Sequence, residues 1–303
     1  MVEFVVLGVA SSAGTHHAGL DRAPAALREA GLVDRLRSAG VQVHDLGDVV
    51  IEVFAVDHER PTARNLPAVV RVVRAVADLV DEVATRGAVP LVLGGDCTIT
   101  LGVVAGLQRR RPNLGVFYFD GDADLATPAT TTSGVLDAMG IAHLLGLADT
   151  ELSRVGDRFP MLTEQRLVLF GYDGSDPETF HPEVLAAHPG LQHVSDRLVR
   201  ADPAGQAADA LGGLLRACDG VVVHFDVDAV DSGDLPLANF PHYGTGVTLA
   251  QAGQALRVAA AADGLAGVVL TEVNPAHDPD GRQMERYVAM VAAALAPEAE
   301  ARY

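Results

Sequence analysis

The sequence predicts an α/β protein built on a mostly parallel sheet, and two patterns indicate this class. Short runs rich in Val, Leu and Phe recur and are continuously apolar, as expected for strands that are covered on both faces. Helical stretches separate these runs, and strands that alternate with helices form parallel sheets. The strands are expected at 4–10, 89–95, 114–120, 166–173, 220–228 and 267–275, with helices at, for example, 23–36, 66–87 and 248–262.

The first predicted strand, at 4–10, begins almost at the amino terminus. Glu3 interrupts the apolar run and no basic region precedes it, so we expect a buried strand and no secretory signal. No stretch reaches the roughly 18 uncharged apolar residues of a membrane-spanning helix. The two cysteines, Cys97 and Cys218, cannot form a disulfide framework. We expect a cytoplasmic protein in a reducing compartment, with no membrane partner.

Composition indicates one domain over residues 1–303 and argues against nucleic acid as a partner. With 303 residues and 49% apolar content, the chain can bury a large aliphatic core. There is no internal repeat, low-complexity tract or long Pro/Gly/Ser linker. The 22 basic and 40 acidic residues give a net charge of −18, whereas a protein that wraps a phosphate backbone needs clustered Lys and Arg.

Nearly all the polar residues that could bind a metal or take part in catalysis follow predicted strands, in the segments 95–97, 120–124, 226–231 and 272–275. Ligands of open α/β sheets bind at the carboxyl ends of the strands, so the four segments indicate one site. In two of them, alternate carboxylates follow an apolar strand and in extended geometry point the same way. Their repulsion is difficult to sustain without a divalent cation, and two ions bridged by shared carboxylates can activate a water molecule.

A single Asp at a strand end could instead cap a helix or form a turn. Asp231, which Ser-Gly follows, fits that alternative best. The two aspartate segments together, however, favour the metal interpretation.

Five segments resemble, in order and spacing, the motif set of the arginase/agmatinase ureohydrolase family. They are GGDCTITLG at 94–102, FDGDADLATP at 119–128, TTTSG at 130–134, HFDVDAVD at 224–231 and TEVNP at 271–275. The resemblance implies a three-layer α/β/α sandwich, a trimer or hexamer, and a binuclear manganese site that hydrolyses a guanidino or amidino group.

The resemblance also implies the metal ligands. The family's carboxylate ligands correspond to Asp120, Asp124, Asp226 and Asp228, all present here. Its two histidine ligands correspond to Cys97 and Asp122, so both imidazoles are replaced. Its proton-shuttling histidine corresponds to Asp137.

These replacements change the expected chemistry of the ions. Five Asp and a thiolate carry about six negative charges against four positive, which raises the pKa of a bound water. The soft Cys97 ligand shifts preference from Mn towards Zn, Fe or Co. Two alternatives stay open: Cys97 is a packing residue, or Asp122 is too short to reach a metal.

The expected substrate is a small cationic amidine or guanidino compound other than free L-arginine. Glu272 corresponds to the family glutamate that faces the guanidinium, and a carboxylate suits a planar cation. Asp176 corresponds to a residue that helps to hold the α-amino group, unless it is a turn residue before proline. Ser133 is retained at the amino-acid end, but Ala126 and Val135 replace amides there, and each lost donor costs about 1–3 kcal/mol.

Four histidines could restore acid/base chemistry, namely His16, His17, His143 and His242. Of these, His16 and His17 fit surface or packing roles better, and His143 fits a core role.

Two functions remain open: an amidine hydrolase, or a divergent non-catalytic homologue that binds a ligand or partner. A phosphoryl-transfer enzyme is less favoured because no glycine-rich phosphate cradle or Lys/Arg clamp accompanies the acids.

Overall fold

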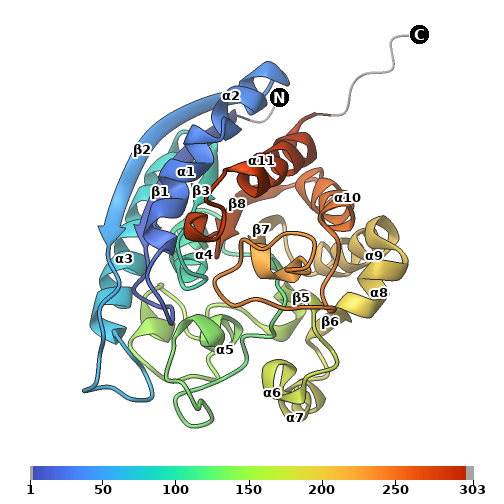
Figure 1. Ribbon diagram of the computed structural model, residues 1–303. Helices are drawn as coiled ribbons and strands as arrows, with labels where there is room; N and C mark the ends of the chain where they lie inside the picture. The colour runs from blue at the N-terminus through green and yellow to red at the C-terminus, as the bar shows by residue number, and fades with distance from the viewer. Residues whose placement is uncertain (1–2, 298–303) are drawn as a thin grey trace.

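A parallel sheet of eight strands dominates the computed structural model, which describes residues 3–297 except for the side chains of residues 177 and 178 (Figure 1). Within that range the strand order is β2-β1-β3-β8-β7-β4-β5-β6. The strands are β1 (Glu3–Ser11), β2 (Gln42–Glu52), β3 (Val89–Leu93), β4 (Leu114–Phe119), β5 (Leu167–Tyr172), β6 (Gln192–Ser195), β7 (Gly220–Asp226) and β8 (Leu265–Thr271). The predicted parallel sheet is therefore confirmed.

Helices cover both faces of the sheet. The α-helices are α1 (Ala23–Glu29), α2 (Leu32–Ser38), α3 (Leu66–Thr85), α4 (Ile99–Gln108), α5 (Gly140–Leu144), α6 (Pro177–Phe180), α7 (Pro182–Ala187), α8 (Asp196–Ala201), α9 (Pro203–Leu214), α10 (Leu249–Ala260) and α11 (Arg282–Leu295). One apolar core joins α1, α2, α9, α10 and α11 to one side of the strands, and a second joins α3, α4 and α5 to the other. This is the three-layer α/β/α sandwich.

The alternation of side chains along β1 shows how one strand serves both cores. Phe4 and Val6 belong to the first core, whereas Val5 and Leu7 belong to the second. Both sets are buried, which explains why the strand is continuously apolar in sequence.

The four strands that the candidate site segments follow lie side by side in the middle of the sheet, in the order β3-β8-β7-β4. The segment after each strand therefore emerges next to the segments after its neighbours. Register supports this, because Phe225 of β7 pairs with both Phe119 of β4 and Leu270 of β8. The sheet thus gathers the segments that follow residues 93, 119, 226 and 271 at one edge.

The sequence prediction was incomplete at the sheet edges and wrong at one helix. The edge strands β2 and β6 were not predicted, because an exposed edge strand lacks the continuous apolar run of a buried one; none of the residues of β2 is buried. The predicted helix at 23–36 is two helices, since Gly31 adopts φ 87° between them. The helices predicted at 66–87 and 248–262 are confirmed as α3 and α10.

Among the described residues, none of the helices is long and apolar enough to span a membrane.

Candidate metal centre

A cavity of about 500 Å³ opens at the carboxyl edge of the sheet, and carboxyl groups dominate its lining. The predicted site residues that line it are Cys97, Asp120, Asp122, Asp124, Ser133, Asp137, Asp226, Asp228 and Glu272. Asp176 is exposed and is not part of the lining; Thr179 of α6 and His181, between α6 and α7, take part instead. The substrate-binding role of Asp176 therefore stays a prediction.

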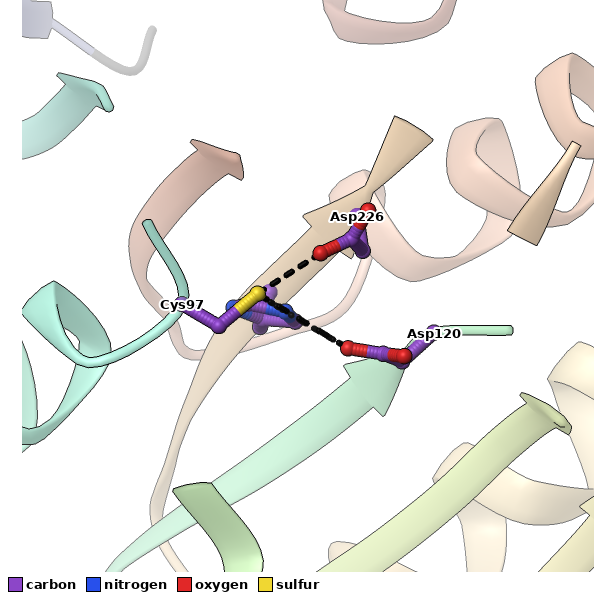
Figure 2. A group of neighbouring side chains, drawn as sticks. Cys97, Asp120 and Asp226 are labelled. Atoms are coloured by element: carbon purple, nitrogen blue, oxygen red, sulfur yellow. Dashed lines mark hydrogen bonds and ion pairs between the residues drawn. The ribbon is translucent and has the colours of Figure 1, made fainter. Parts of the chain in front are cut away.

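Cys97 lies at the centre of the acid cluster, between the ends of β4 and β7. Its thiol donates to Asp226 Oδ2 at 2.6 Å, and its Sγ lies 3.9 Å from Asp120 Oδ2. Figure 2 shows these three side chains pointing toward one another from three segments of the chain. Burial, followed by the nearby charge of Asp226, raises the pKa of the thiol well above its usual value.

Backbone amides fix the orientation of three carboxylates. Asp120 Oδ1 accepts from the Asp122 amide at 2.7 Å, and Asp226 Oδ1 accepts from the Asp228 amide at 2.7 Å. Asp228 Oδ1 accepts from the Gly121 amide at 2.9 Å. A Cβ at Gly121 would lie 2.7 Å from the Asp228 carbonyl oxygen, so only glycine allows the β4 and β7 segments to approach this closely.

Asp124 completes the group of four predicted carboxylate ligands. Its Oδ2 accepts a hydrogen bond from the buried Tyr118 hydroxyl at 2.5 Å. Its φ of 49° is in the left-handed region, which is uncommon for Asp and indicates that the surroundings hold this residue in place. Sequence reasoning did not find Tyr118, because it lies within an apolar strand whose pattern gives no sign of a polar contact.

Without a bound cation, the buried carboxyl groups of the cluster favour their protonated forms. Burial, reinforced by neighbouring carboxylates, raises the pKa values of Asp120, Asp124 and Asp226 well above the usual range. Burial also raises the pKa of Asp137 to about 8, with Asp96 as the next cause. It raises the pKa of Asp228 to about 6, where nearby His242 opposes the rise. A divalent ion would remove this repulsion and keep the carboxylates ionised.

Two buried carboxyl oxygens have no hydrogen-bond partner within residues 3–297, namely Asp122 Oδ1 and Glu272 Oε1. Leaving such an atom unpaired is costly, so each is expected to face a ligand. Together with the oxygen-rich donor set and the cavity, these atoms fit divalent cations and a cationic ligand.

Glu272 directly follows β8 and lines the cavity. Its φ of 61° turns the chain out of the strand, and its amide donates to the Gly95 carbonyl at 3.0 Å. Its carboxyl group, that of Asp137 and the Cys97 thiol have ligand atoms within 4.8 Å of one another. Burial and the nearby charge of Asp137 raise the pKa of Glu272.

His224 is a member of the cluster that sequence reasoning missed. Its Nε2 lies 3.6 Å from Cys97 Sγ and 3.5 Å from Asp120 Oδ2, while its Nδ1 lies 2.7 Å from Thr100 Oγ1. The ring stacks on Tyr118 with centroids 3.9 Å apart. A signal was available: residues 224 and 226 of one strand share a face, so His224 points towards the same edge as Asp226.

The four histidines considered from sequence divide into separate groups. His242 Nε2 lies 3.5 Å from Asp122 Oδ1, and its pKa is raised to about 9: burial lowers it, but the neighbouring carboxylates, Asp122 first, more than compensate. His16 lines the cavity, whereas His17 is exposed and does not. His143 is buried against Met139 O and Thr150 Oγ1, as expected for a core residue.

Two further aspartates shape the loops around the site. Asp231 accepts hydrogen bonds from the Gly233 and Gly244 amides and is a turn residue, as the Ser-Gly context indicated. Asp96 is buried and accepts from the Gly14 amide at 3.0 Å, which joins the loop after β1 to the loop after β3.

Comparison with known proteins identifies the family. A model of the arginase family matches residues 2–298. The arginase of Brevibacillus brevis is 32% identical over 291 residues, which cover 96% of this chain and 95% of the relative. The native structure of arginase from Bacillus caldovelox has a TM-score of 0.90 at 29% identity, covering 98% of this chain and 99% of that chain. The formimidoylglutamase of Bacillus subtilis has a TM-score of 0.75 at 18% identity, with 97% and 86% covered, a likeness of fold alone.

Proposed function

The chain belongs to the arginase family of metal-dependent ureohydrolases, and on this premise we propose that it hydrolyses a C–N bond of a small cationic guanidino or amidino compound other than free L-arginine. The observation that carries the proposal is the buried Glu272 carboxyl group, whose Oε1 has no hydrogen-bond partner among the described residues and which lines an acid-rich cavity.

The proposed metal centre holds two divalent ions. Asp120, Asp124, Asp226 and Asp228 supply the carboxylates, and Cys97 and Asp122 stand where the resemblance implies histidines. Bound ions would supply a Lewis acid and lower the pKa of a water molecule. Mn is the metal typical of the family, but the thiol of Cys97 favours Zn, Fe or Co.

The lining of the cavity selects for positive charge. Seven carboxyl groups face it, and none of its described lining residues is Lys or Arg. A planar amidinium can donate paired hydrogen bonds to Glu272, and charge-assisted bonds of this kind are about twice as strong as neutral ones. The cation would also keep Glu272 ionised in spite of its raised pKa.

Asp137 is the proposed proton donor. Its pKa of about 8 keeps the carboxyl protonated at neutral pH, and the Cys97 amide fixes its Oδ1 at 2.8 Å. In the reaction, the oxygen of water forms a bond to the amidine carbon, and the C–N bond breaks with its electron pair going to nitrogen. That nitrogen takes the proton from Asp137, and a proton of the water returns to Asp137, so the products are a urea or amide and an amine.

The outer part of the cavity disfavours an α-carboxylate. Ala126 and Val135 line it with apolar side chains, where the resemblance implies amide donors. The Ser133 hydroxyl accepts from the Val135 amide at 3.2 Å and is half-buried. Each absent donor costs about 1–3 kcal/mol for a charged group that depends on it, which corresponds to roughly 5- to 150-fold in selectivity per contact.

A panel of candidate substrates tests the proposal. Arginine, N-hydroxyarginine, agmatine, guanidinobutyrate and formiminoglutamate are assayed for urea or amine release with Mn, Zn, Fe and Co in turn. We expect turnover of a cationic amidine, weak or no turnover of arginine, and a lower kcat/KM for the amidine in Glu272→Gln. Brisk arginine hydrolysis would contradict the selectivity argument.

The second candidate function is a non-catalytic homologue that binds a ligand or partner, and the replacement of both histidines by Cys97 and Asp122 favours it. No detectable hydrolysis of any substrate in the panel with any of the four metals would support this alternative.

We also propose that the protein forms a homo-oligomer, a trimer or hexamer; light scattering would measure its mass in solution.

A further inference from the structure

We propose that His224 and His242 supply imidazole ligands to the metal centre, so that one ion is held by sulfur, nitrogen and oxygen and the other by nitrogen and oxygen. The inference rests on the metal centre of the proposed function but not on its substrate. It concerns two histidines that stand beside Cys97 and Asp122, the two positions where the resemblance implied imidazoles.

The first position consists of Cys97, Asp120, His224 and Asp226, all buried, whose ligand atoms lie within 4.8 Å of one another. Metal–ligand bonds of about 2.0–2.3 Å in a tetrahedral zinc site separate the ligand atoms by about 3.3–3.8 Å. The observed distances are 3.5 Å from His224 Nε2 to Asp120 Oδ2, 3.6 Å from His224 Nε2 to Cys97 Sγ, and 3.9 Å from Cys97 Sγ to Asp120 Oδ2.

One distance in this group is too short for a coordinated ion. Cys97 Sγ and Asp226 Oδ2 are 2.6 Å apart, closer than a sulfur and an oxygen ligand of one ion stand. A cation bound between them would separate these atoms by about 1 Å while leaving the other three distances nearly unchanged. The position therefore needs only a small adjustment to bind metal.

The second position consists of Asp122, Asp228 and His242, whose ligand atoms also lie within 4.8 Å of one another. The distances from His242 Nε2 are 3.5 Å to Asp122 Oδ1 and 4.0 Å to Asp228 Oδ2. His242 is 9% exposed, and its Nε2 and Asp122 Oδ1 have no hydrogen-bond partner within the described chain beyond this ion pair with each other. Buried polar atoms in this state point to a ligand between them.

Local hydrogen bonds hold the His224 ring and the backbone of the loop that carries His242. Thr100 Oγ1 lies 2.7 Å from His224 Nδ1; when Nδ1 carries the proton, it donates to Thr100 and leaves the Nε2 lone pair facing the cluster. The loop that carries His242 is closed by the Ser232 amide, which donates to the His242 carbonyl at 2.8 Å. The Gly244 amide donates to Asp231 in the same loop.

The donor set predicts which metals bind. A thiolate and an imidazole at the first position favour Zn, Co or Fe over Mn, because soft ligands select these ions. The second position has two carboxylates and one imidazole and accepts either kind of ion.

Cobalt titration of the chelator-treated full chain tests the inference without any turnover assay. We expect two equivalents of Co²⁺ to bind, with a thiolate-to-cobalt charge-transfer band in the near ultraviolet that Cys97→Ser abolishes. His224→Asn should weaken the first site by more than about 100-fold, since even an outer-shell partner contributes 10- to 100-fold. His242→Asn should remove the second equivalent and keep the band. His143→Asn is the matched control, a buried histidine outside the cluster, and should bind as the parent does.

X-ray absorption of the zinc-loaded parent protein provides a measurement that does not depend on a variant's folding. We expect the zinc ions to show a sulfur neighbour from Cys97 and the multiple scattering that is typical of imidazole ligands. Metal bound with only oxygen neighbours, or unchanged cobalt affinity in both folded histidine variants, would overturn the inference and leave the proposed hydrolase possible. Histidine-bound metal without hydrolysis of any amidine would instead refute the hydrolase and support the inference.

Discussion

Replacing Thr100 by Val removes the hydroxyl that contacts His224 Nδ1 and keeps nearly the same side-chain shape. Both residues are fully buried and the two atoms are 2.7 Å apart, so no water replaces the lost partner. An unsatisfied buried donor costs about 1–3 kcal/mol, which should lower the melting temperature by a few degrees. Loss of the group that orients a metal-binding imidazole should also weaken metal affinity about 10- to 100-fold.

The chain contains a matched control for this change. Thr150 Oγ1 lies 3.0 Å from His143 Nε2, outside the metal cluster. Thr150 is partly buried, so water can replace its hydroxyl; Thr150→Val should therefore lower the melting temperature by no more than Thr100→Val does and leave cobalt affinity unchanged. Thermal unfolding of the metal-free proteins and Co²⁺ titration of both variants separate the two effects. Equal cobalt affinity in Thr100→Val and the parent protein would refute the argument that Thr100 orients a metal ligand.

Three further predictions concern the substrate pocket and the core. Glu272→Gln should lower kcat/KM for a cationic amidine by roughly 10- to 150-fold, the equivalent of one charge-assisted hydrogen bond; an unchanged value would show that the cation is held elsewhere. Ala126→Asn combined with Val135→Asn should raise kcat/KM for arginine at least about tenfold, measured as urea release, because donors return to the amino-acid end. Burial lowers the pKa of His143 to about 4 from 6.5 in the unfolded chain. Between these two pKa values the unfolded state binds more protons than the folded state, so about 3 kcal/mol of unfolding free energy should be lost as pH falls from 6.5 to 4. Denaturant unfolding should show that the stability of His143→Gln depends less on pH than that of the parent protein over this range.

The acid cluster shows how far local pattern carries a site prediction. Asp120 and Asp124, and likewise Asp226 and Asp228, follow continuously apolar strands, which marks them as polar groups at strand ends. The pairing of β4 with β7 then places the two pairs in one cavity. The sequence could indicate each pair, because each depends on a few consecutive residues.

The histidines show where local pattern was insufficient. His224 lies in the same apolar run as Asp226, and its two-residue spacing from that Asp was visible, but its approach to Cys97 joins residues 127 apart in sequence. His242 reaches Asp122 from a long loop with no periodic pattern. Asp176, predicted from the resemblance alone, lies outside the cavity lining.

The sequence by itself determined the α/β class, the buried strands and the strand-end acids, because continuous apolar runs and alternating carboxylates depend on neighbouring residues in the chain. The tertiary structure decided the strand order β3-β8-β7-β4 and therefore which strand ends meet. It also decided that β2 and β6 form the edges of the sheet and that His224 and His242 lie beside Cys97 and Asp122. The physical reason is that contacts between distant segments are set by the packing of helices on both faces of the sheet, which optimises the total burial of apolar surface and leaves no local signature in the chain.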